Sequence, residues 1–436
     1  MNKIHIVHIA VHLGGGAGKA ISGIIHQTMD QINNEVILLE IPKNTFYIEA
    51  LRNIGVPITI SNDADTVAER ISENDIAVVN WWGHPLMIKI LAKLPIVKGR
   101  FVIWNHINGC SYPYLRTEFL NVFDKILFTT PYSEHNNLWE LGQKKKILEK
   151  SALVYGMGDF NPAKICPKKS FFNDGKLTIG YAGTINYAKL NRKWLDYYEK
   201  AVENFESIEI LMLGEPSKEV LEDVKKSRIK EHIKFTGYVT DVYKYYSQMD
   251  IFAYFLSNEN YATTENAMLE AMASGLPVIA LNHPVEAHII EIDENGILIS
   301  CPDEFAEAIR WLVMDENAKR LGEKAREYCI RKYSPETNVK VFFEVCKAAS
   351  EMKRHLFTVK DVLGNNPFEF FCRQAGKERK LFEKIGNGGK ITEEEIRKLP
   401  YIYRETDKAS VHQFLNYFPG NRDLKILEEC INRYEN

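Results

Sequence analysis

Short apolar runs alternate with amphipathic helical stretches from the first residues of the chain to about residue 350. In the first half, the pattern predicts strands at 4–10, 36–41, 76–81, 101–104 and 126–130. In the second half, it predicts strands at 177–182, 208–213, 233–235, 251–255, 278–281 and 297–300. Alternation at this spacing is typical of parallel sheets covered by helices on both faces. The sequence therefore predicts an α/β fold with two doubly wound domains facing a cleft.

A stretch with Gly, Pro and Asn residues at 155–176 interrupts this alternation. Such composition is typical of a connection between structural units. We therefore place the linker there and expect an N-terminal domain at 1–160 and a C-terminal domain at 170–335.

The composition changes again after the second domain. Pro335 suits the first position of a helix, which we expect to cross back over 336–354. Beyond it strand patterns disappear, and 355–436 is predicted to be a helical extension, either a small appendage or helices that wrap the second domain. Its predicted helices are a capping-box helix starting at Thr392 and Glu395, and stretches at 368–385, 409–418 and 424–434.

Composition narrows the class of protein. The chain has 436 residues, 45% of them hydrophobic and 26% charged, and a net charge of −3, which gives no reason to expect nucleic-acid binding or strong membrane attraction. Its seven cysteines form no C-x-x-C pair, which argues against a disulfide framework and a zinc site. The apolar run near Met1 is too short for a signal peptide, so we expect a cytoplasmic protein.

A glycine cluster, Gly14, Gly15 and Gly16, follows the first predicted strand and precedes a helical pattern. It lacks the spacing of the triphosphate-binding loop, because Leu13 and Ala20 occupy two required positions. It also lacks the third glycine of the dinucleotide pattern. Two interpretations remain: the glycines let the first helix pack closely on its sheet, or they let the backbone approach an anionic ligand.

The stretch 249–281 carries the clearest chemistry. A buried strand leads into a polar loop, Thr263 or Thr264 is expected to cap a helix, and Gly275 to end it. The free N–H groups at the start of such a helix suit a phosphate. Glu270, inside the helix, could accept hydrogen bonds from two neighbouring hydroxyls such as those of a ribose.

Several motifs occur in the order found in one family. "LEAMASGLPVIA" resembles the nucleotide-sugar site of GT-B glycosyltransferases of the retaining family 4 group. The stretches "GGGAGKAISG", "ILFTTPYSEHNNL", "VYGMGDFNP", "IGYAGTINYAKLN", "IKFTGYV" and "NGILIS" are similar to further segments of that family. The resemblance covers roughly residues 1–350 and implies two Rossmann-like domains, with the nucleotide-sugar-binding domain second and the acceptor-side domain first.

The resemblance also implies roles for individual residues. Glu270 would hold the ribose, Lys189 would neutralise the diphosphate, and His106, Lys189, Glu265 and Glu270 form the expected catalytic set. The donor-binding residues implied besides Lys189 and Glu270 are Gly14, Gly15, Gly16, Gly183, Thr184, Tyr238, Val239, Thr263, Thr264, Glu265 and Asn266. No metal and no cofactor is implied, since the nucleotide sugar is a substrate.

The sequence departs from the family pattern at two places. Ala262 stands where the family has its first glutamate, and Glu265 or, more weakly, Glu259 could substitute. Glu265 would then face the transferred sugar, or simply oppose the helix dipole. Thr184 occupies the position of the family's arginine, and Arg192 or Lys193 could compensate for its charge.

Candidates on the acceptor side are His84, His106 and Asn108, which follow predicted strands of the first domain. Histidines at such places also serve as capping or packing residues. Trp81 and Trp82 could stack on a sugar or fill the core.

Two charged patterns could each indicate a binding site. Asp63 and Asp65 imitate a metal-binding triplet, but their context favours a helix cap. The run Lys144–Lys146 lies on a predicted polar connection and indicates a solvated face, or contact with anionic lipid.

These observations predict a retaining, metal-independent hexosyltransferase that moves a sugar from a nucleotide-diphosphate donor to a glycan, lipid-linked or protein acceptor, and that binds no nucleic acid. Cell-surface glycan synthesis is the expected context. The extension at 355–436 could recognise the acceptor, dock a partner, touch the membrane or make a dimer. The alternatives are a sugar-nucleotide epimerase on the same fold and a non-catalytic partner subunit.

Overall fold

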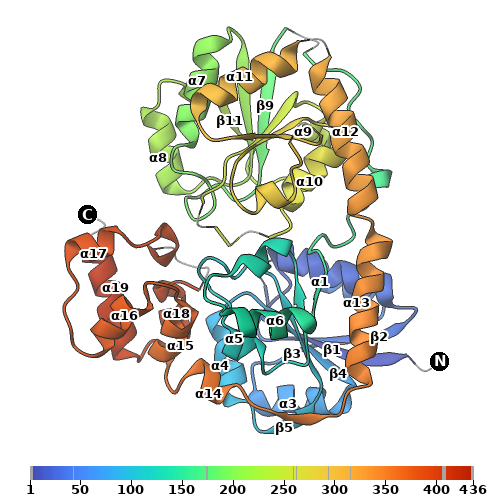
Figure 1. Ribbon diagram of the computed structural model, residues 1–436, viewed down its shortest axis with the longest axis vertical. Helices are drawn as coiled ribbons and strands as arrows, with labels where there is room; N and C mark the ends of the chain where they lie inside the picture. The colour runs from blue at the N-terminus through green and yellow to red at the C-terminus, as the bar shows by residue number, and fades with distance from the viewer. Residues whose placement is uncertain are drawn as a thin grey trace. The chain divides into compact units, whose positions relative to one another are not determined.

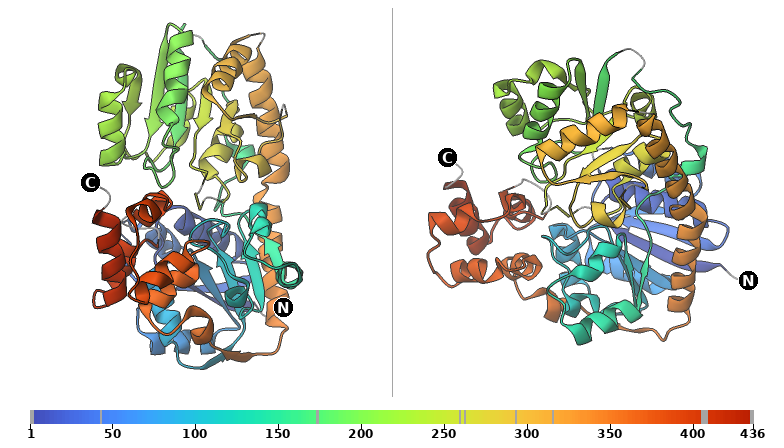
Figure 2. Two further views of the ribbon diagram at one scale, coloured as in Figure 1. Left: turned by 60° about the vertical axis from the view of Figure 1, so that its left-hand side comes forward. Right: turned by 45° about the horizontal axis from the view of Figure 1, so that its top comes forward.

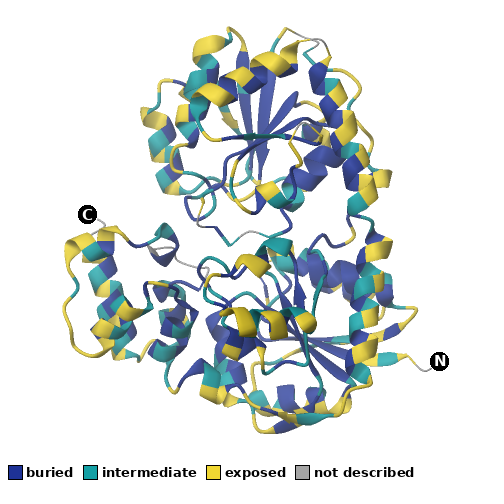
Figure 3. Cartoon of the chain, viewed as in Figure 1, coloured by how far each residue is buried: buried dark blue, intermediate teal, exposed yellow. Residues whose placement is uncertain are grey.

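The computed structural model describes residues 3–42, 44–172, 175–258, 260–261, 263–292, 294–314, 316–404 and 409–433. The chain forms two compact units. The first unit combines residues 1–159 with residues 336–436, and the second comprises residues 160–335. Figure 1 shows the elements of each unit, and Figure 3 shows that the strands of both sheets are buried while exposed residues lie on the outer faces of the helices.

The first unit is built on a seven-stranded parallel sheet of order β3-β2-β1-β4-β6-β7-β8. Its strands are β1 (Ile4–Ala10), β2 (Ile32–Leu38), β3 (Ile58–Ile60), β4 (Ile76–Trp81), β6 (Phe101–Asn105), β7 (Lys125–Phe128) and β8 (Ser151–Leu153). The predicted bounds of β1 and β4 are confirmed, because both strands are mostly apolar and mostly buried. The short strands β3 and β8 were not predicted.

Helices α1 (Gly15–Thr28) and α2 (Phe46–Asn53) pack their apolar residues into one core with strands of this sheet. The further helices of residues 1–159 are α3 (Ala64–Glu73), α4 (Pro85–Lys93), α5 (Thr117–Leu120) and α6 (Leu141–Glu149). Asp63 caps α3 by accepting a hydrogen bond from the Thr66 N–H, as the cap interpretation predicted. Lys144–Lys146 lie within α6 and not on a connection, which corrects the sequence prediction.

The second unit is a six-stranded parallel sheet of order β11-β10-β9-β12-β13-β14. Its strands are β9 (Leu177–Ala182), β10 (Ile208–Leu213), β11 (Ile233–Phe235), β12 (Ile251–Tyr254), β13 (Val278–Leu281) and β14 (Ile297–Ile299), all within one residue of the predicted bounds. Its helices are α7 (Trp194–Asn204), α8 (Lys218–Lys226), α9 (Val242–Tyr246), α10 (Asn266–Ala273), α11 (Pro302–Val313) and α12 (Asn317–Lys332). Helices α7 and α11 pack side by side, as do α10 and α12 (Figure 2).

Helix α13 (Pro335–Ser350) returns the chain to the first unit, and it ends four residues before the predicted limit. Its buried residues Phe342, Cys346 and Ala349 complete the core that α1 and β1 begin. The chain then forms β15 (His355–Phe357), which pairs antiparallel with β5 (Val97–Gly99). The expectation that strands end before residue 355 was therefore wrong.

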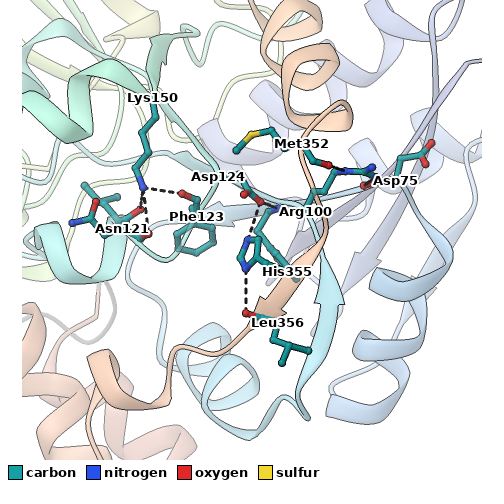
Figure 4. Close-up of polar contacts among 11 residues, drawn as sticks. Asp75, Arg100, Asn121, Phe123, Asp124, Lys150, Met352, His355 and Leu356 are labelled. Atoms are coloured by element: carbon teal, nitrogen blue, oxygen red, sulfur yellow. Dashed lines mark hydrogen bonds and ion pairs between the residues drawn. The ribbon is translucent and has the colours of Figure 1, made fainter.

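Polar contacts fix this return of the chain (Figure 4). The Arg100 Nε donates to the Met352 carbonyl oxygen at 2.6 Å. The His355 Nε2 lies 3.1 Å from the Asp124 carboxylate, which also accepts from the Phe101 N–H at 2.6 Å. The segment after α13 is therefore held against the first sheet by side chains that directly precede two of its strands, Arg100 before β6 and Asp124 before β7.

The extension consists of short helices and belongs to the first unit, so it does not wrap the second domain. Its helices are α14 (Lys360–Leu363), α15 (Pro367–Gln374), α16 (Arg379–Gly386), α17 (Glu393–Arg397), α18 (Val411–Tyr417) and α19 (Arg422–Arg433). The single helix predicted at 368–385 is two helices, α15 and α16. The capping box of Thr392 and Glu395 is confirmed at the start of α17. Among the described residues, no helix combines the length and apolarity needed to span a bilayer.

Candidate functional site

In the second unit, β12 leads through a polar loop to α10, as predicted, but the start of the helix differs. The N-cap residue is Glu265, which has a left-handed backbone (φ 50°, ψ 57°), and neither Thr263 nor Thr264 caps the helix. Gly275, at φ +74°, follows the end of the helix as expected. Ala262, at the position of the family's first glutamate, and Glu259, the weaker of its two possible substitutes, lie outside the described residues.

Glu265 and Lys189 form an ion pair. The Lys189 Nζ lies 3.3 Å from the Glu265 Oε2, and the lysine side chain is 20% exposed while the glutamate side chain is 1% exposed. The Tyr254 hydroxyl, at the end of β12, donates to the same carboxylate oxygen. Lys189 also lies 5.8 Å from the centre of the Tyr254 ring. The structure therefore brings two of the predicted catalytic residues together at the start of α10.

A third charged residue near this pair was not predicted. Glu286, in a 3-10 turn (Glu286–His288) after β13, is fully buried. Burial first, and then the negative charge of Glu265, raise the pKa of Glu286 from its ordinary value to about 8, and the charge of Lys189 partly opposes this. The sequence held one signal, a single acidic residue inside the apolar run "PVEAHII".

Glu270 occupies a different environment from Glu265. It is 9% exposed, and it lies one turn into α10 beside the buried Tyr246. Burial and then the charge of Glu270 raise the pKa of the Tyr246 hydroxyl, which donates to the Ala267 carbonyl oxygen at 3.2 Å. The two glutamates therefore have separate partners.

The other predicted donor-binding residues of this unit lie beyond the carboxyl ends of its strands. Gly183 and Thr184 follow β9 and are exposed, and the Thr184 carbonyl oxygen accepts from the Tyr181 hydroxyl at 2.9 Å. Tyr238 and Val239 follow β11, and Tyr238 is 75% exposed. Because β11, β10, β9 and β12 are neighbours in the sheet, these residues and the start of α10 share one sheet edge, where open α/β folds bind ligands.

Arg192 and Lys193, which could compensate for the arginine that Thr184 replaces, are not part of the Lys189–Glu265 ion pair. Arg192 pairs with Glu219 at 3.1 Å, and its guanidinium lies 4.6 Å from the centre of the Tyr187 ring. Lys193 is exposed at the start of α7. Thr264 is buried beside Glu265, while Thr263 and Asn266 are half-buried.

In the first unit, Gly14, Gly15 and Gly16 stand at the start of α1, and Gly15 has φ +58°. A methyl group added to Gly15 or Gly16 would meet no atom within 4 Å. Close packing of α1 instead depends on Gly23, where such a methyl group would lie 2.3 Å from the Gly158 backbone. The packing interpretation was therefore wrong for Gly15 and Gly16, and it applies further along the helix. A methyl group added to Gly14 would lie 3.0 Å from the His12 Nδ1.

The acceptor-side candidates are held by local hydrogen bonds. The His106 Nε2 lies 3.0 Å from the Asn80 Oδ1, and burial, followed by the charge of His8, lowers the pKa of His106 to about 3. His84 is the N-cap of α4, where its Nδ1 accepts from the Leu86 N–H at 3.2 Å. Asn108 is buried and accepts at its Oδ1 from the Cys110 N–H at 2.8 Å. Two residues that were not predicted, His12 and Glu40, lie near His84, because one nitrogen of each histidine and one Glu40 oxygen are within 4.8 Å of one another. The Tyr417 hydroxyl donates to the Glu40 Oε2 at 2.6 Å.

Comparisons with known proteins agree on the fold. Residues 176–315 match the family described as "Glycosyl transferases group 1". A stretch of 120 residues, 27% of this chain and 34% of the relative, is 25% identical to the lipopolysaccharide core biosynthesis glycosyltransferase LpsE of Rhizobium meliloti. The match thus spans about a third of that relative's length.

Solved structures resemble most of the chain. The structure of Anabaena HepE in complex with UDP and glucose has a TM-score of 0.61 at 14% identity, covering 79% of this chain and 100% of that one. The apo form of the lipopolysaccharide outer core galactosyltransferase WaaB has a TM-score of 0.59 at 15% identity, covering 79% and 99%. The chain therefore has the GT-B glycosyltransferase fold, and residues 176–315 of its second unit are similar to the group 1 glycosyl transferases.

Proposed function

We propose that the protein is a retaining glycosyltransferase that moves a sugar from a nucleotide-diphosphate sugar to a glycan, lipid-linked or protein acceptor, in the synthesis of a cell-surface glycan. The observation that carries the proposal is the Lys189–Glu265 pair at the start of α10, inside the segment that matches the glycosyltransferase family. The nucleotide found with HepE and the names of LpsE and WaaB support the donor class and the glycan context.

The chemistry follows from the charge that develops as the donor breaks. Departure of a nucleoside diphosphate builds negative charge on phosphate oxygens, which fixed positive groups stabilise in the transition state. The Lys189 ammonium and the N–H groups of the first turn of α10 lie together and are suited to receive it. Glu265 compensates the lysine charge, and the diphosphate would compete with Glu265 for it.

Glu270 is assigned to the nucleoside. Its carboxylate lies one turn into α10 beside Tyr246, and its two oxygens can accept hydrogen bonds from the two hydroxyls of a ribose. In this proposal the chain's own groups neutralise the diphosphate, and no protein nucleophile attacks the sugar.

Substitution of Lys189 tests the proposal. Lys189→Ala should lower kcat about 100-fold or more, because removal of one such charge-stabilising donor typically has that effect. Glu270→Ala should lower activity as well, mainly through the KM of the donor. The measurement is release of nucleoside diphosphate from UDP-, GDP- and ADP-sugars, with thermal melting to verify that both variants are folded.

Lys176→Ala is the matched control. Lys176 also forms an ion pair in the second unit, 3.1 Å from Glu209, but it precedes β9 and so lies at the opposite end of the strand. Its removal should leave turnover unchanged. Near-normal rates in a folded Lys189→Ala variant would remove the site assignment.

Product analysis separates the proposal from its alternatives. A glycosyltransferase consumes an acceptor, whereas an epimerase converts the nucleotide sugar without one. A protein that is not stabilised thermally by any nucleotide sugar would be a non-catalytic subunit, since ligand binding to the native state raises the melting temperature.

A further inference from the structure

Glu286 is a buried acidic residue with no role in the chemistry described above. It begins the 3-10 turn after β13, and its carbonyl oxygen accepts from the Ile289 and Ile290 N–H groups at 2.9 and 2.7 Å, which fixes its backbone. The side chain is fully buried, and neither carboxyl oxygen has a hydrogen bond to another described residue. Taking such a group out of water without a partner costs free energy, so its presence here calls for a reason.

Three polar side chains from other parts of the second unit lie near Glu286. They are Lys189 in the loop after β9, Tyr254 at the end of β12 and Glu265 at the start of α10, and β12 is a neighbour of β13 in the sheet. These three are already joined to one another, by the 3.3 Å ion pair and by the hydrogen bond of the Tyr254 hydroxyl. We call them, together with Glu286, the Lys189 group.

The other titratable side chains around this turn leave the charge of the Lys189 group unchanged. Lys332 of α12 donates to the His288 carbonyl oxygen at 3.5 Å, and the His288 Nδ1 lies 2.6 Å from a carbonyl oxygen of the preceding loop. Burial lowers the pKa of His283, which is therefore neutral above pH 7, and Glu291 is exposed. Among the described residues, the charges that act on the Glu286 carboxyl group belong to the Lys189 group.

The Lys189 group holds two carboxyl groups and one ammonium group. If both carboxyl groups were ionised, the group would carry one net negative charge, which a protein interior disfavours. One of them therefore keeps its proton at neutral pH. Lys189 and Tyr254 stabilise the ionised form of Glu265, whereas Glu286 has no hydrogen bond to another described residue. The proton thus belongs on Glu286, in agreement with its pKa of about 8.

The protonation of Glu286 decides how strongly the protein itself holds the Lys189 ammonium. While Glu286 is protonated, the ammonium balances one carboxylate, and the lysine side chain, which is 20% exposed, can still reach a ligand. Once Glu286 is ionised, the same ammonium faces two carboxylates, and an incoming diphosphate meets an additional negative charge. Loss of the proton should therefore weaken diphosphate binding. By linkage, a bound diphosphate should draw a proton onto Glu286.

We propose that Glu286 is a positioning residue that, in its protonated form, leaves the Lys189 ammonium available to the diphosphate of the donor, and that release of this proton in weakly alkaline solution weakens donor binding. This inference rests on the proposed function and adds a dependence on pH to its donor site. In this role Glu286 touches no substrate and acts only through Lys189 and Glu265.

The test measures the affinity for nucleoside diphosphates as a function of pH. The probes are UDP, GDP and ADP, and calorimetry at pH 7, 8 and 9 uses the one that binds most tightly at pH 7. Measurements at pH 8 in two buffers of different ionisation enthalpy give the number of protons taken up on binding. The variant is Glu286→Gln, which keeps the shape of the side chain but cannot ionise. The matched control is Glu291→Gln, which changes an exposed glutamate of the same segment.

The Kd of the wild-type protein should rise about tenfold from pH 7 to pH 9, and binding at pH 8 should take up about half a proton, because Glu286 is then half ionised. In Glu286→Gln the Kd should change less than about twofold over this range and the proton uptake should vanish, while Glu291→Gln should behave as the wild type. A merely structural role would change the Kd equally at every pH. If Glu286→Gln does not fold, Glu286→Met, which is also uncharged and similar in length, takes its place.

A wild-type Kd that does not depend on pH would overturn the inference, as would a pH dependence that Glu286→Gln retains or the failure of all three nucleotides to bind. Sugar-transfer assays separate this inference from the proposed function. A Kd that depends on pH through Glu286, in a protein that transfers no sugar, would support this inference while the proposed function fails. Sugar transfer by a protein whose nucleotide Kd is independent of pH would give the opposite result.

Discussion

Glu265 has a left-handed backbone conformation (φ 50°), which few residues other than glycine and asparagine adopt. Such a conformation persists where surrounding contacts fix it, and here the carboxylate is held by Lys189 and the Tyr254 hydroxyl. Capping preference alone favours Thr263 or Thr264, and so it gave the wrong N-cap. The contacts that override it come from β12 and from the loop after β9, which sequence spacing does not reveal.

At the same scale, Glu286 predicts a pH dependence of stability. Its pKa is raised from 4.5 in the unfolded chain to about 8 in the folded protein, so the native state holds the proton more tightly. Its contribution to the free energy of unfolding is therefore complete below pH 4.5 and is lost as the pH rises from 4.5 to about 8. The loss is on the order of 1 kcal/mol per pH unit within that window.

Glu286→Gln should remove this dependence and melt at a higher temperature than the wild-type protein at pH 8. The measurement is thermal unfolding of both proteins by circular dichroism between pH 5 and pH 9. Only the difference between the two curves is interpreted, because other groups titrate in both. Parallel curves across the range would show that Glu286 keeps its ordinary pKa.

At the scale of elements, α1 requires a glycine where it contacts the segment after β8, and not only at its start. Gly23→Ala would place a methyl group 2.3 Å from the backbone of Gly158, a position that cannot move without shifting the segment after β8. Overpacking of this kind typically lowers the free energy of unfolding by about 1–3 kcal/mol. We expect a loss in that range or above it, measured by urea unfolding.

Gly16→Ala is the control within the same helix, because its new methyl group meets no atom within 4 Å. It should leave stability unchanged or slightly higher, since alanine favours the helix. Equal losses in the two variants would show that the helix itself, and not its contact with Gly158, responds to the substitution.

The strands that could be predicted differ physically from those that could not. β1, β4, β9 and β10 lie inside their sheets, so most of their residues are buried and apolar. The strands missed by sequence analysis are three residues long and partly exposed: β3, β5, β8 and β15. Strands of this length give only a weak signal in the sequence, because pairing rather than burial defines them, although the equally short edge strands β11 and β14 were predicted.

The candidate site also combines residues that could be predicted from the sequence with residues that could not. Lys189 and Glu270 were predicted from motif resemblance, and the strand-loop-helix pattern placed α10 at a sheet edge. Glu40 and Tyr417 could not be predicted, because 377 residues separate them in the sequence and only the fold brings them together. No local pattern distinguishes such a tyrosine from one that is simply packed.

At the scale of the whole molecule, the extension is part of the first unit's structure. The Phe357 ring of β15 stacks on Phe101 with ring centres 3.8 Å apart, and the Tyr403 ring lies 4.3 Å from Tyr112. Sequence analysis could not choose between the two units as the partner of the extension, because apolar helix residues such as Phe371 and Phe414 could pack on either sheet.

Removal of residues 355–436 should therefore loosen the first unit selectively. Hydrogen exchange followed by mass spectrometry should show at least about tenfold faster exchange in peptides around β6 and Tyr112, because the truncation exposes their apolar neighbours. Peptides from β9 and β10 should exchange as in the full chain. Equal protection at β6 in both proteins would show that the first unit keeps its stability without the extension.

The arrangement of the two units has a consequence for biosynthesis. Residues 160–335 are complete as soon as they leave the ribosome, whereas the first unit lacks α13 and β15 until the last quarter of the chain has been translated. Domains generally fold as units during synthesis. The second unit should therefore reach its native state first. Residues 1–159 of the nascent chain must wait, with the surface that Phe342 and Cys346 will cover still open to chaperones.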